Sequence, residues 1–343
     1  MYIENNTIKN YISFWLVSMF FIISVMIVVG GLTRLTDSGL SITEWQLFSG
    51  FLPPLNNADW EYYFELYKKI PEFYLQNYSM TLSEFKVIFW WEWIHRFLGR
   101  LIGLSFLLPL VYFTYKVSFT RLKSLYLIFF LICFQGFIGW YMVSSGLVDR
   151  VDVSHFRLAI HLLMAFIILS LILWNYLKLK NVIFSKEKVK FHLPIILLIL
   201  IFFQITIGAF VSGMDAGTIY NTWPLMGSSY FPDDNKLINL FNINSFSDPS
   251  LVQFIHRNLA YFILFFYVFL LLNVYKNKLS KFYYCTKIVG VILLIQIVLG
   301  IFTLVYGAQI LLASMHQISS IFLVSSNIYL IYLNSNTSLQ PSN

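Results

Sequence analysis

The chain has 343 residues, of which 58% are hydrophobic and only 11% are charged. Soluble domains have about 45–50% apolar and about 25% charged residues, so this composition excludes a water-soluble enzyme. The formal net charge is +7, but the basic residues lie in short loops between apolar runs, which excludes a nucleic-acid partner.

Eight apolar segments follow one another along the chain. A helix needs about 20 predominantly apolar residues to cross the hydrocarbon core of a bilayer. We therefore predict an all-α integral membrane protein with eight transmembrane helices. The predicted spans are residues 12–31, 94–115, 122–143, 156–177, 191–212, 252–274, 284–305 and 309–332. The first is longer than the apolar core of a signal peptide, so we expect it to be retained.

The loops between these spans differ in charge. Lysine and arginine concentrate in the loops at residues 116–123, 175–190 and 273–287. The positive-inside rule places these three loops, and with them both termini, in the cytoplasm. The long loops at about 32–90 and 213–251 are then outside.

The first half of the chain resembles the second. The matched pairs are Gly30 with Gly208, Asp37 with Asp215, His95 with His256, Arg96 with Arg257, Gln135 with Gln296, Gly139 with Gly300, and His161 with His316. Each half has four spans, so the repeat is parallel, with its axis along the membrane normal. We predict two pseudo-symmetric four-helix bundles, in residues 1–180 and 181–343.

Four of the six histidines belong to this repeat. His95, His161, His256 and His316 each lie within about two helical turns of the outer end of a predicted span. Ionisable residues inside membrane spans are costly and usually functional. Two imidazoles that face each other from neighbouring helices can ligate a haem iron. The alternative is that each histidine is hydrogen-bonded in a helix interface.

Other metal sites fit this pattern less well. Structural zinc takes four ligands, usually including cysteine, whereas Cys133 and Cys285 lie in or beside apolar runs and form no C-x-x-C motif. Non-haem iron or copper would need a carboxylate or thiolate, which only Glu92 of the first half could supply. Two further histidines, His155 and His192, have no partner in the repeat; we expect His192 to be interfacial and leave the role of His155 open.

Arginines accompany the histidines. Arg96 and Arg257 directly follow His95 and His256, and Arg34 lies in a Gly-Gly-Leu-Thr-Arg sequence after the first span. A guanidinium binds a carboxylate through two parallel hydrogen bonds, so these residues are candidates to pair with haem propionates. The alternative for Arg96 and Arg257 is that they extend to the outer headgroups.

The repeat is broken at one position near the histidines. Glu92 lies three residues before His95 and shares a helix face with it, whereas Gln253 occupies the matching position before His256. A carboxylate beside a substrate can transfer protons or stabilise developing positive charge. We therefore predict a catalytic first half and an accessory second half. The alternative is an interfacial glutamate solvated by the outer loop.

Five motifs carry a resemblance to a known family over residues 12–332. They are Gly30-Gly31-Leu32-Thr33-Arg34-Leu35-Thr36, Glu92-Trp93-Ile94-His95-Arg96-Phe97-Leu98-Gly99-Arg100, Arg157-Leu158-Ala159-Ile160-His161, Gln253-Phe254-Ile255-His256-Arg257 and Met315-His316-Gln317. In these motifs the chain resembles the heme A synthase family. It lacks cysteine pairs in its outer loops, as does the alphaproteobacterial and mitochondrial subtype of the family.

The resemblance implies an oxidoreductase of the bacterial inner membrane. Its expected reaction oxidises the C8 methyl group of haem O to a formyl group, giving haem A for cytochrome oxidase assembly. The resemblance implies haem b as cofactor, with its iron held by His256 and His316. It places the substrate haem O iron near His95 and His161, with Glu92 needed for the chemistry. Membrane lipid surrounds the chain, and a haem O synthase, an electron donor and a homo-oligomer stay open as partners.

Two rival classes predict different features. A b-type membrane cytochrome with bis-histidine haems would transfer electrons without modifying haem, and Glu92 would have no special role. A transporter would show polar, broken helices at the membrane midplane, and the sequence has few such residues there.

Overall fold

A computed structural model describes residues 5–45, 49–148, 150–180 and 187–335. Eight of its helices are long and apolar enough to cross a membrane, which confirms the predicted fold class. They are α1 (Asn6–Leu35), α4 (Leu82–Lys116), α5 (Phe119–Gly146), α6 (His155–Lys180), α7 (Leu193–Gly213), α8 (Pro249–Lys276), α9 (Ser280–Val305) and α10 (Ile310–Ser335).

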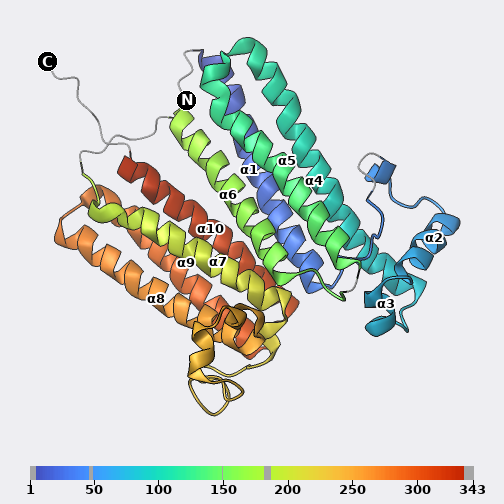
Figure 1. Cartoon of the computed structure of the whole chain (residues 1–343). Helices are drawn as coiled ribbons and strands as arrows, with labels where there is room; N and C mark the ends of the chain where they lie inside the picture. The colour runs from blue at the N-terminus through green and yellow to red at the C-terminus, as the bar shows by residue number, and fades with distance from the viewer. Residues whose placement is uncertain (1–4, 46–48, 149, 181–186, 336–343) are drawn as a thin grey trace.

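The long helices lie side by side in two groups of four (Figure 1). One group is α1, α4, α5 and α6, and the other is α7 to α10. The groups meet along α1 and α6 on one side and α7 and α10 on the other. The predicted boundary between residues 180 and 181 borders residues 181–186, which lie outside the described residues, so the division into two domains stays a prediction.

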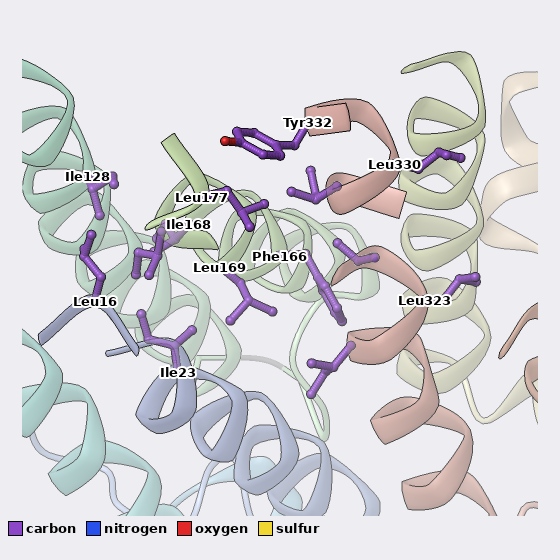
Figure 2. Packing of buried hydrophobic residues seen from close by; sticks show 14 of the residues in the cluster. Leu16, Ile23, Ile128, Phe166, Ile168, Leu169, Leu177, Leu323, Leu330 and Tyr332 are labelled. Carbon is purple, nitrogen blue, oxygen red and sulfur yellow. The ribbon is translucent and has the colours of Figure 1, made fainter. Parts of the chain in front are cut away.

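The core between the two groups is apolar. Figure 2 shows Leu16 and Ile23 of α1, Phe166 and Leu169 of α6, and Leu323 of α10 among its side chains. These residues have 0–4% of their surface exposed. Because lipid tails are as apolar as leucine, such contacts stabilise the interface by close packing rather than by the hydrophobic effect.

Helix α10 is the most enclosed span. In its most apolar 18-residue window 67% of the residues are buried, against 11–39% in the other seven spans, and that window is also the least apolar of the eight. Asn327 donates from Nδ2 to the carbonyl of Pro194 over 3.1 Å, and Asn334 accepts from the N–H of Val189 over 2.7 Å. Polar and small residues are tolerated here because protein, not lipid, surrounds the helix.

The outer end of α4 extends further than predicted. The helix begins at Leu82 rather than at residue 94, because Thr81 and Glu84 form a capping box there. Two short helices, α2 (Asn57–Tyr67) and α3 (Pro71–Leu75), cover this extension (Figure 1). We call α2, α3 and residues 82–89 the outer platform.

The outer platform has its own aromatic core. Trp60, Phe64, Tyr67, Phe85 and Phe89 are buried against one another with ring centres 5.0–5.8 Å apart. Aromatic pairs at such separations stabilise by more than the area they bury.

One carboxyl group lies inside the outer platform. Glu72 is 2% exposed and accepts a hydrogen bond of 3.1 Å from the hydroxyl of Tyr67. Burial raises the pKa of Glu72 to about 8. The carboxyl group is therefore largely protonated at neutral pH.

The remaining helices are single 3₁₀ turns in the connections. They are Ser49–Phe51, Lys190–His192, Ala216–Thr218, Leu237–Phe241 and Ile243–Ser247. The first residues of α1 and the last residues of α10 lie at one end of the bundle, and the outer platform lies at the other (Figure 1). This arrangement is the one expected when the ends of α1 and α10 share one side of the membrane and the long loops share the other; which side is cytoplasmic stays a prediction.

Candidate functional site

Each of the four repeated histidines rests against a glycine of a neighbouring helix. A Cβ atom at Gly30 of α1 would lie 2.8 Å from Cε1 of His95, and one at Gly139 of α5 would lie 3.0 Å from Cε1 of His161. In the second half the same atoms would be 3.0 Å apart for Gly208 with His256 and 2.9 Å apart for Gly300 with His316. Distances this short leave no room for a side chain, so the glycines let each imidazole lie directly on a helix backbone.

The two histidines of the first half face each other. The ring centres of His95 on α4 and His161 on α6 are 6.4 Å apart. Metal–imidazole bonds are about 2.0 Å long and each nitrogen lies about 1.1 Å from its ring centre, so two imidazoles on opposite sides of one metal have centres about 6.2 Å apart. The Nδ1 atoms of both rings are inaccessible and have no hydrogen-bond partner in the described part of the chain. The pair fits a bis-histidine haem.

In the second half, a glutamine side chain lies against each of the two histidines. Nε2 of Gln204 lies 3.3 Å from Nε2 of His256 and donates to the carbonyl of the same residue over 3.0 Å. Nε2 of Gln296 lies 3.4 Å from Nε2 of His316, and Nδ1 of His316 is 3.0 Å from the carbonyl oxygen of Gln296. The Gln296 carbonyl orients the His316 ring, as a carbonyl does beside a metal-binding imidazole, while Nδ1 of His256 has no hydrogen-bond partner among the described residues. In both cases the glutamine amide lies against Nε2, and the use of this pair as haem ligands stays a prediction.

Neither half offers a metal site made of protein ligands alone. Among the residues that the structure describes, no three His, Cys, Asp or Glu side chains gather as they would around a metal ion. Each site provides two imidazoles, and a planar group would have to provide the other ligands. That donor set is the one used for haem iron.

Glu92 is held by the outer loop that follows α1. Its Oε2 accepts hydrogen bonds from the hydroxyl of Ser41 (2.8 Å) and the N–H of Ile42 (2.7 Å). Its Oε1 accepts two from Arg96, from Nε over 3.0 Å and from Nη2 over 2.6 Å. Glu92 is 3% exposed, so the outer loop and Arg96, rather than water, surround its carboxylate. The alternative of a glutamate held by the outer loop without a catalytic role therefore stays open. The carboxylate is a buried, ion-paired anchor one turn from His95.

Arg96 and Arg257 both bind loop backbone. Arg96 donates to the carbonyls of Glu44 and Ile42 over 2.9 and 2.7 Å. Arg257 donates to the carbonyls of Tyr220 (2.9 Å), Thr222 (2.9 Å) and Leu225 (3.2 Å). Arg96 thus donates two hydrogen bonds to the loop that follows α1, and Arg257 donates three to the loop that follows α7, so each arginine fastens a loop next to its histidine. Binding of propionates by either residue stays a prediction.

Gln253 fastens the second loop in the same way. It is 2% exposed and donates from Nε2 to the carbonyl of Tyr220 over 3.1 Å. Glu92 accepts hydrogen bonds from the loop of the first half, whereas Gln253 donates a hydrogen bond to the loop of the second half. The difference between these two repeated positions therefore changes both the charge and the direction of the hydrogen bond.

Arg34 lies between the halves rather than beside an imidazole. It is 9% exposed and pairs with Asp215 of the second half at 2.9 Å, with Asp37 at 2.5 Å and with Asp152 at 3.8 Å. Asp37 and Asp215 have the left-handed backbone, with φ of 47° and 49°, so the repeat is preserved at both turns. Three carboxylates already neutralise this guanidinium, and propionate binding by Arg34 also stays a prediction.

The two unrepeated histidines lie outside both pairs. His155 begins α6, and its ring packs on Phe156 and Phe210 with centres 4.2 and 5.5 Å apart. Its Cβ lies close to Gly213, where α6 meets α7. His192 is exposed in the turn before α7. His155 therefore contributes to the contact between halves in this structure.

Comparisons with known proteins agree with this geometry. Residues 13–328 match the family model described as cytochrome oxidase assembly protein. A protein of Pelagibacter ubique named heme A synthase is 48% identical over 338 residues, which cover 98% of this chain and 100% of that protein. The chain belongs to the heme A synthase family. Family members named heme A synthase in Rickettsia bellii and Rickettsia prowazekii are 43% and 39% identical, covering 91% and 96% of this chain and 94% and 99% of theirs.

The residues that support the histidines were not predicted from the sequence. The four glycines are part of the repeat, and a glycine that recurs at one position of four spans also indicates that another group packs on the backbone there. Gln135 and Gln204 lie four residues before two of these glycines, and each donates to the backbone carbonyl of its histidine. On α1 the same position is Met26, so His95 alone has no such glutamine.

Proposed function

We propose that this protein is a heme A synthase, an oxidoreductase that converts the C8 methyl group of haem O to the formyl group of haem A. The first half holds the substrate haem between His95 and His161, and the second holds haem b between His256 and His316. The observation that carries the assignment is the pair of imidazoles 6.4 Å apart beside a buried carboxylate that only the first half contains.

The reaction would be two successive two-electron oxidations of the methyl carbon, each replacing one C–H bond by a C–OH bond at the expense of an external oxidant such as dioxygen, and the resulting gem-diol loses water to give the aldehyde. The chain contributes placement and charge to this chemistry, because the reactive iron belongs to the haem. His95 and His161 fix the plane of the substrate. Glu92 places negative charge one helical turn away, where it stabilises a developing cation or accepts a proton. Arg96 orients that carboxylate and keeps the loop closed over it.

Haem b in the second half supplies one-electron redox chemistry when it is bound. Gln253 replaces Glu92 in this half, so a neutral amide stands near Arg257 where a carboxylate pairs with Arg96 in the first half. The glutamines Gln204 and Gln296 restrict the motion of His256 and His316, which suits a haem that stays bound.

The expected partners follow from the reaction. Haem O comes from a prenylating synthase, and the oxidation needs an electron donor. The lysine-rich loops support a topology in the inner membrane with both termini in the cytoplasm and the histidine sites at the outer side. A homo-oligomer is compatible with the lipid-exposed faces of the bundle.

A second function is favoured by one observation. All four histidines pack equally closely on a glycine, since a Cβ atom added to each glycine would lie 2.8–3.0 Å from the imidazole Cε1, as expected for two permanent haems of a b-type cytochrome. Such a protein would transfer electrons without modifying haem, and Glu92 would serve only to hold the loop.

Extraction of haem from a host that makes haem O but no haem A distinguishes the two functions. Cells that express the chain should yield haem A, identified by mass, and cells that express His95→Ala should yield none. Haem O alone, together with two fully loaded low-spin haem sites, would contradict the synthase and support the cytochrome.

A further inference from the structure

One contact between the halves lies between the two histidine sites. Nε2 of Gln317 on α10 donates to the carbonyl of Ile27 on α1 over 2.9 Å. The amide of Gln317 occupies the space that a Cβ atom of Gly31 would fill. Gln317 thus inserts into a notch in α1 that exists only because residue 31 is glycine.

The notch and its occupant are each next to a site residue. Gly31 follows Gly30, on which the ring of His95 rests, and Gln317 follows His316 of the second pair. Gly30 therefore contacts the first half, and the next residue, Gly31, contacts the second half. A shift of α10 at His316 reaches the backbone under His95 through a single side chain.

The pseudo-symmetric contact on the other side is apolar. By the repeat, Ala209 of α7 matches Gly31 and Leu162 of α6 matches Gln317. Ala209 is 2% exposed in a small apolar cluster on which Leu162 packs. The same fold therefore makes this interface without a notch or a hydrogen bond, so packing alone does not require Gln317.

A second tie fixes the same segment of α1. Arg34 lies one turn beyond Gly31 and pairs with Asp215 of the second half at 2.9 Å. This ion pair and the Gln317 amide together hold the outer third of α1 to the second half at two points. Packed elements of this kind transmit small displacements because they do not deform continuously.

We propose that Gln317 is a positioning residue that couples the two haem sites, so that haem bound by His256 and His316 raises the affinity of the first site. The inference rests on the proposed function, because it takes both histidine pairs as haem sites. Coupling of this kind is reciprocal and typically changes an affinity by about 5- to 150-fold.

Haem titration of purified protein tests the coupling without turnover. Protein produced with limiting haem, so that only the second site is filled, is titrated with iron protoporphyrin IX. The same titration is done on His316→Ala. The first site should bind at least about fivefold more tightly in the wild-type protein. Equal affinities in these two proteins would overturn the proposal.

Two variants separate the amide from packing. In Gln317→Leu, the ratio of the first-site affinity with the second site filled to that with the second site disabled by His316→Ala should fall toward one. The haem in the second site of Gln317→Leu should keep its low-spin spectrum because His316 is intact. The double variant Gly31→Ala with Gln317→Leu copies the Ala209–Leu162 pair; it should fold as the wild type does and stay uncoupled. Restored coupling in the double variant, or a wild-type ratio in Gln317→Leu, would show that the amide is dispensable.

A matched control removes another polar contact of α10. Asn327→Leu loses the hydrogen bond to Pro194, which lies within the second half and away from both sites. It should leave the ratio of affinities unchanged, and a fall equal to that of Gln317→Leu would overturn the specific role of residue 317. A wild-type chain that shows the coupling but makes no haem A would contradict the proposed function alone.

Discussion

Replacing Glu92 by glutamine should damage the protein in two separable ways. The carboxylate accepts four hydrogen bonds, two from Arg96 and one each from Ser41 and Ile42. A glutamine amide can satisfy only one side, because its NH₂ group must then face either the guanidinium or the N–H of Ile42. At 3% exposure water cannot replace the lost partners.

The expected size of the structural effect follows from this burial. Removing one member of a buried ion pair costs about 3–5 kcal/mol, because the other charge is left unpaired. Ser41→Ala removes one neutral donor and should cost about 1 kcal/mol. Arg96→Gln leaves the carboxylate unpaired and should destabilise about as much as Glu92→Gln. All three should open the loop at residues 38–45, with Glu92→Gln and Arg96→Gln about equally severe and Ser41→Ala the mildest.

Thermal unfolding, limited proteolysis of the outer loop and haem extraction together measure both effects. Glu92→Gln should lower the unfolding midpoint, expose the loop and accumulate haem O or a hydroxymethyl intermediate. Arg96→Gln, equally unstable, should retain more haem A if the carboxylate acts on the substrate itself. Unchanged stability and an intact loop in Glu92→Gln would refute the reasoning from burial, and equal haem A in both variants would reduce Glu92 to an anchor.

Three further predictions test other parts of the molecule. His256→Ala or His316→Ala should remove most of the b-type haem absorbance of the purified protein, and unchanged absorbance would contradict the assignment. A reporter active only in the cytoplasm should work when fused after Asn343, which lies beyond the described residues, and one active only outside should work near Asn235; the reverse pattern would invert the topology. Because the folded pKa of Glu72 is about 8, the outer platform should lose stability as pH rises from about 4.5 to 8, where the unfolded chain has released the proton and the folded chain keeps it. Glu72→Gln should flatten this pH dependence in proteolysis assays, and an unaltered slope would assign it to another group.

The spans and the facing histidines could be predicted because both depend on local sequence. About twenty apolar residues specify a membrane helix whatever it packs against. The distances of His95 and His161 from the ends of their predicted spans place both at a similar depth in the membrane. The prediction started α4 too late, because counting apolar residues does not detect a first part of a helix that also contains polar residues. Its capping box, Thr81 with Glu84, was a local signal that the count overlooked.

The environment of the charged residues could not be predicted in the same way. Arg96 lies four residues from Glu92, so their pairing was available from helical spacing, but the loop carbonyls that complete it are about 50 residues away in sequence. Arg34 meets Asp215 only after the two halves pack. A sequence shows that a buried arginine needs a partner without showing which of several carboxylates approaches it.

The enclosure of α10 has a consequence for biogenesis. This helix follows the other seven spans in the described part of the chain, is the least apolar of the eight and has most of its residues buried against protein. Entry into the bilayer therefore depends on a vacant slot already formed by α1, α6, α7 and α9. Since α10 carries His316, the second histidine pair is completed only once this helix has entered the slot. Haem capture by this half therefore has to follow the insertion of α10, and a chain truncated before Ile310 would leave the walls of that slot exposed.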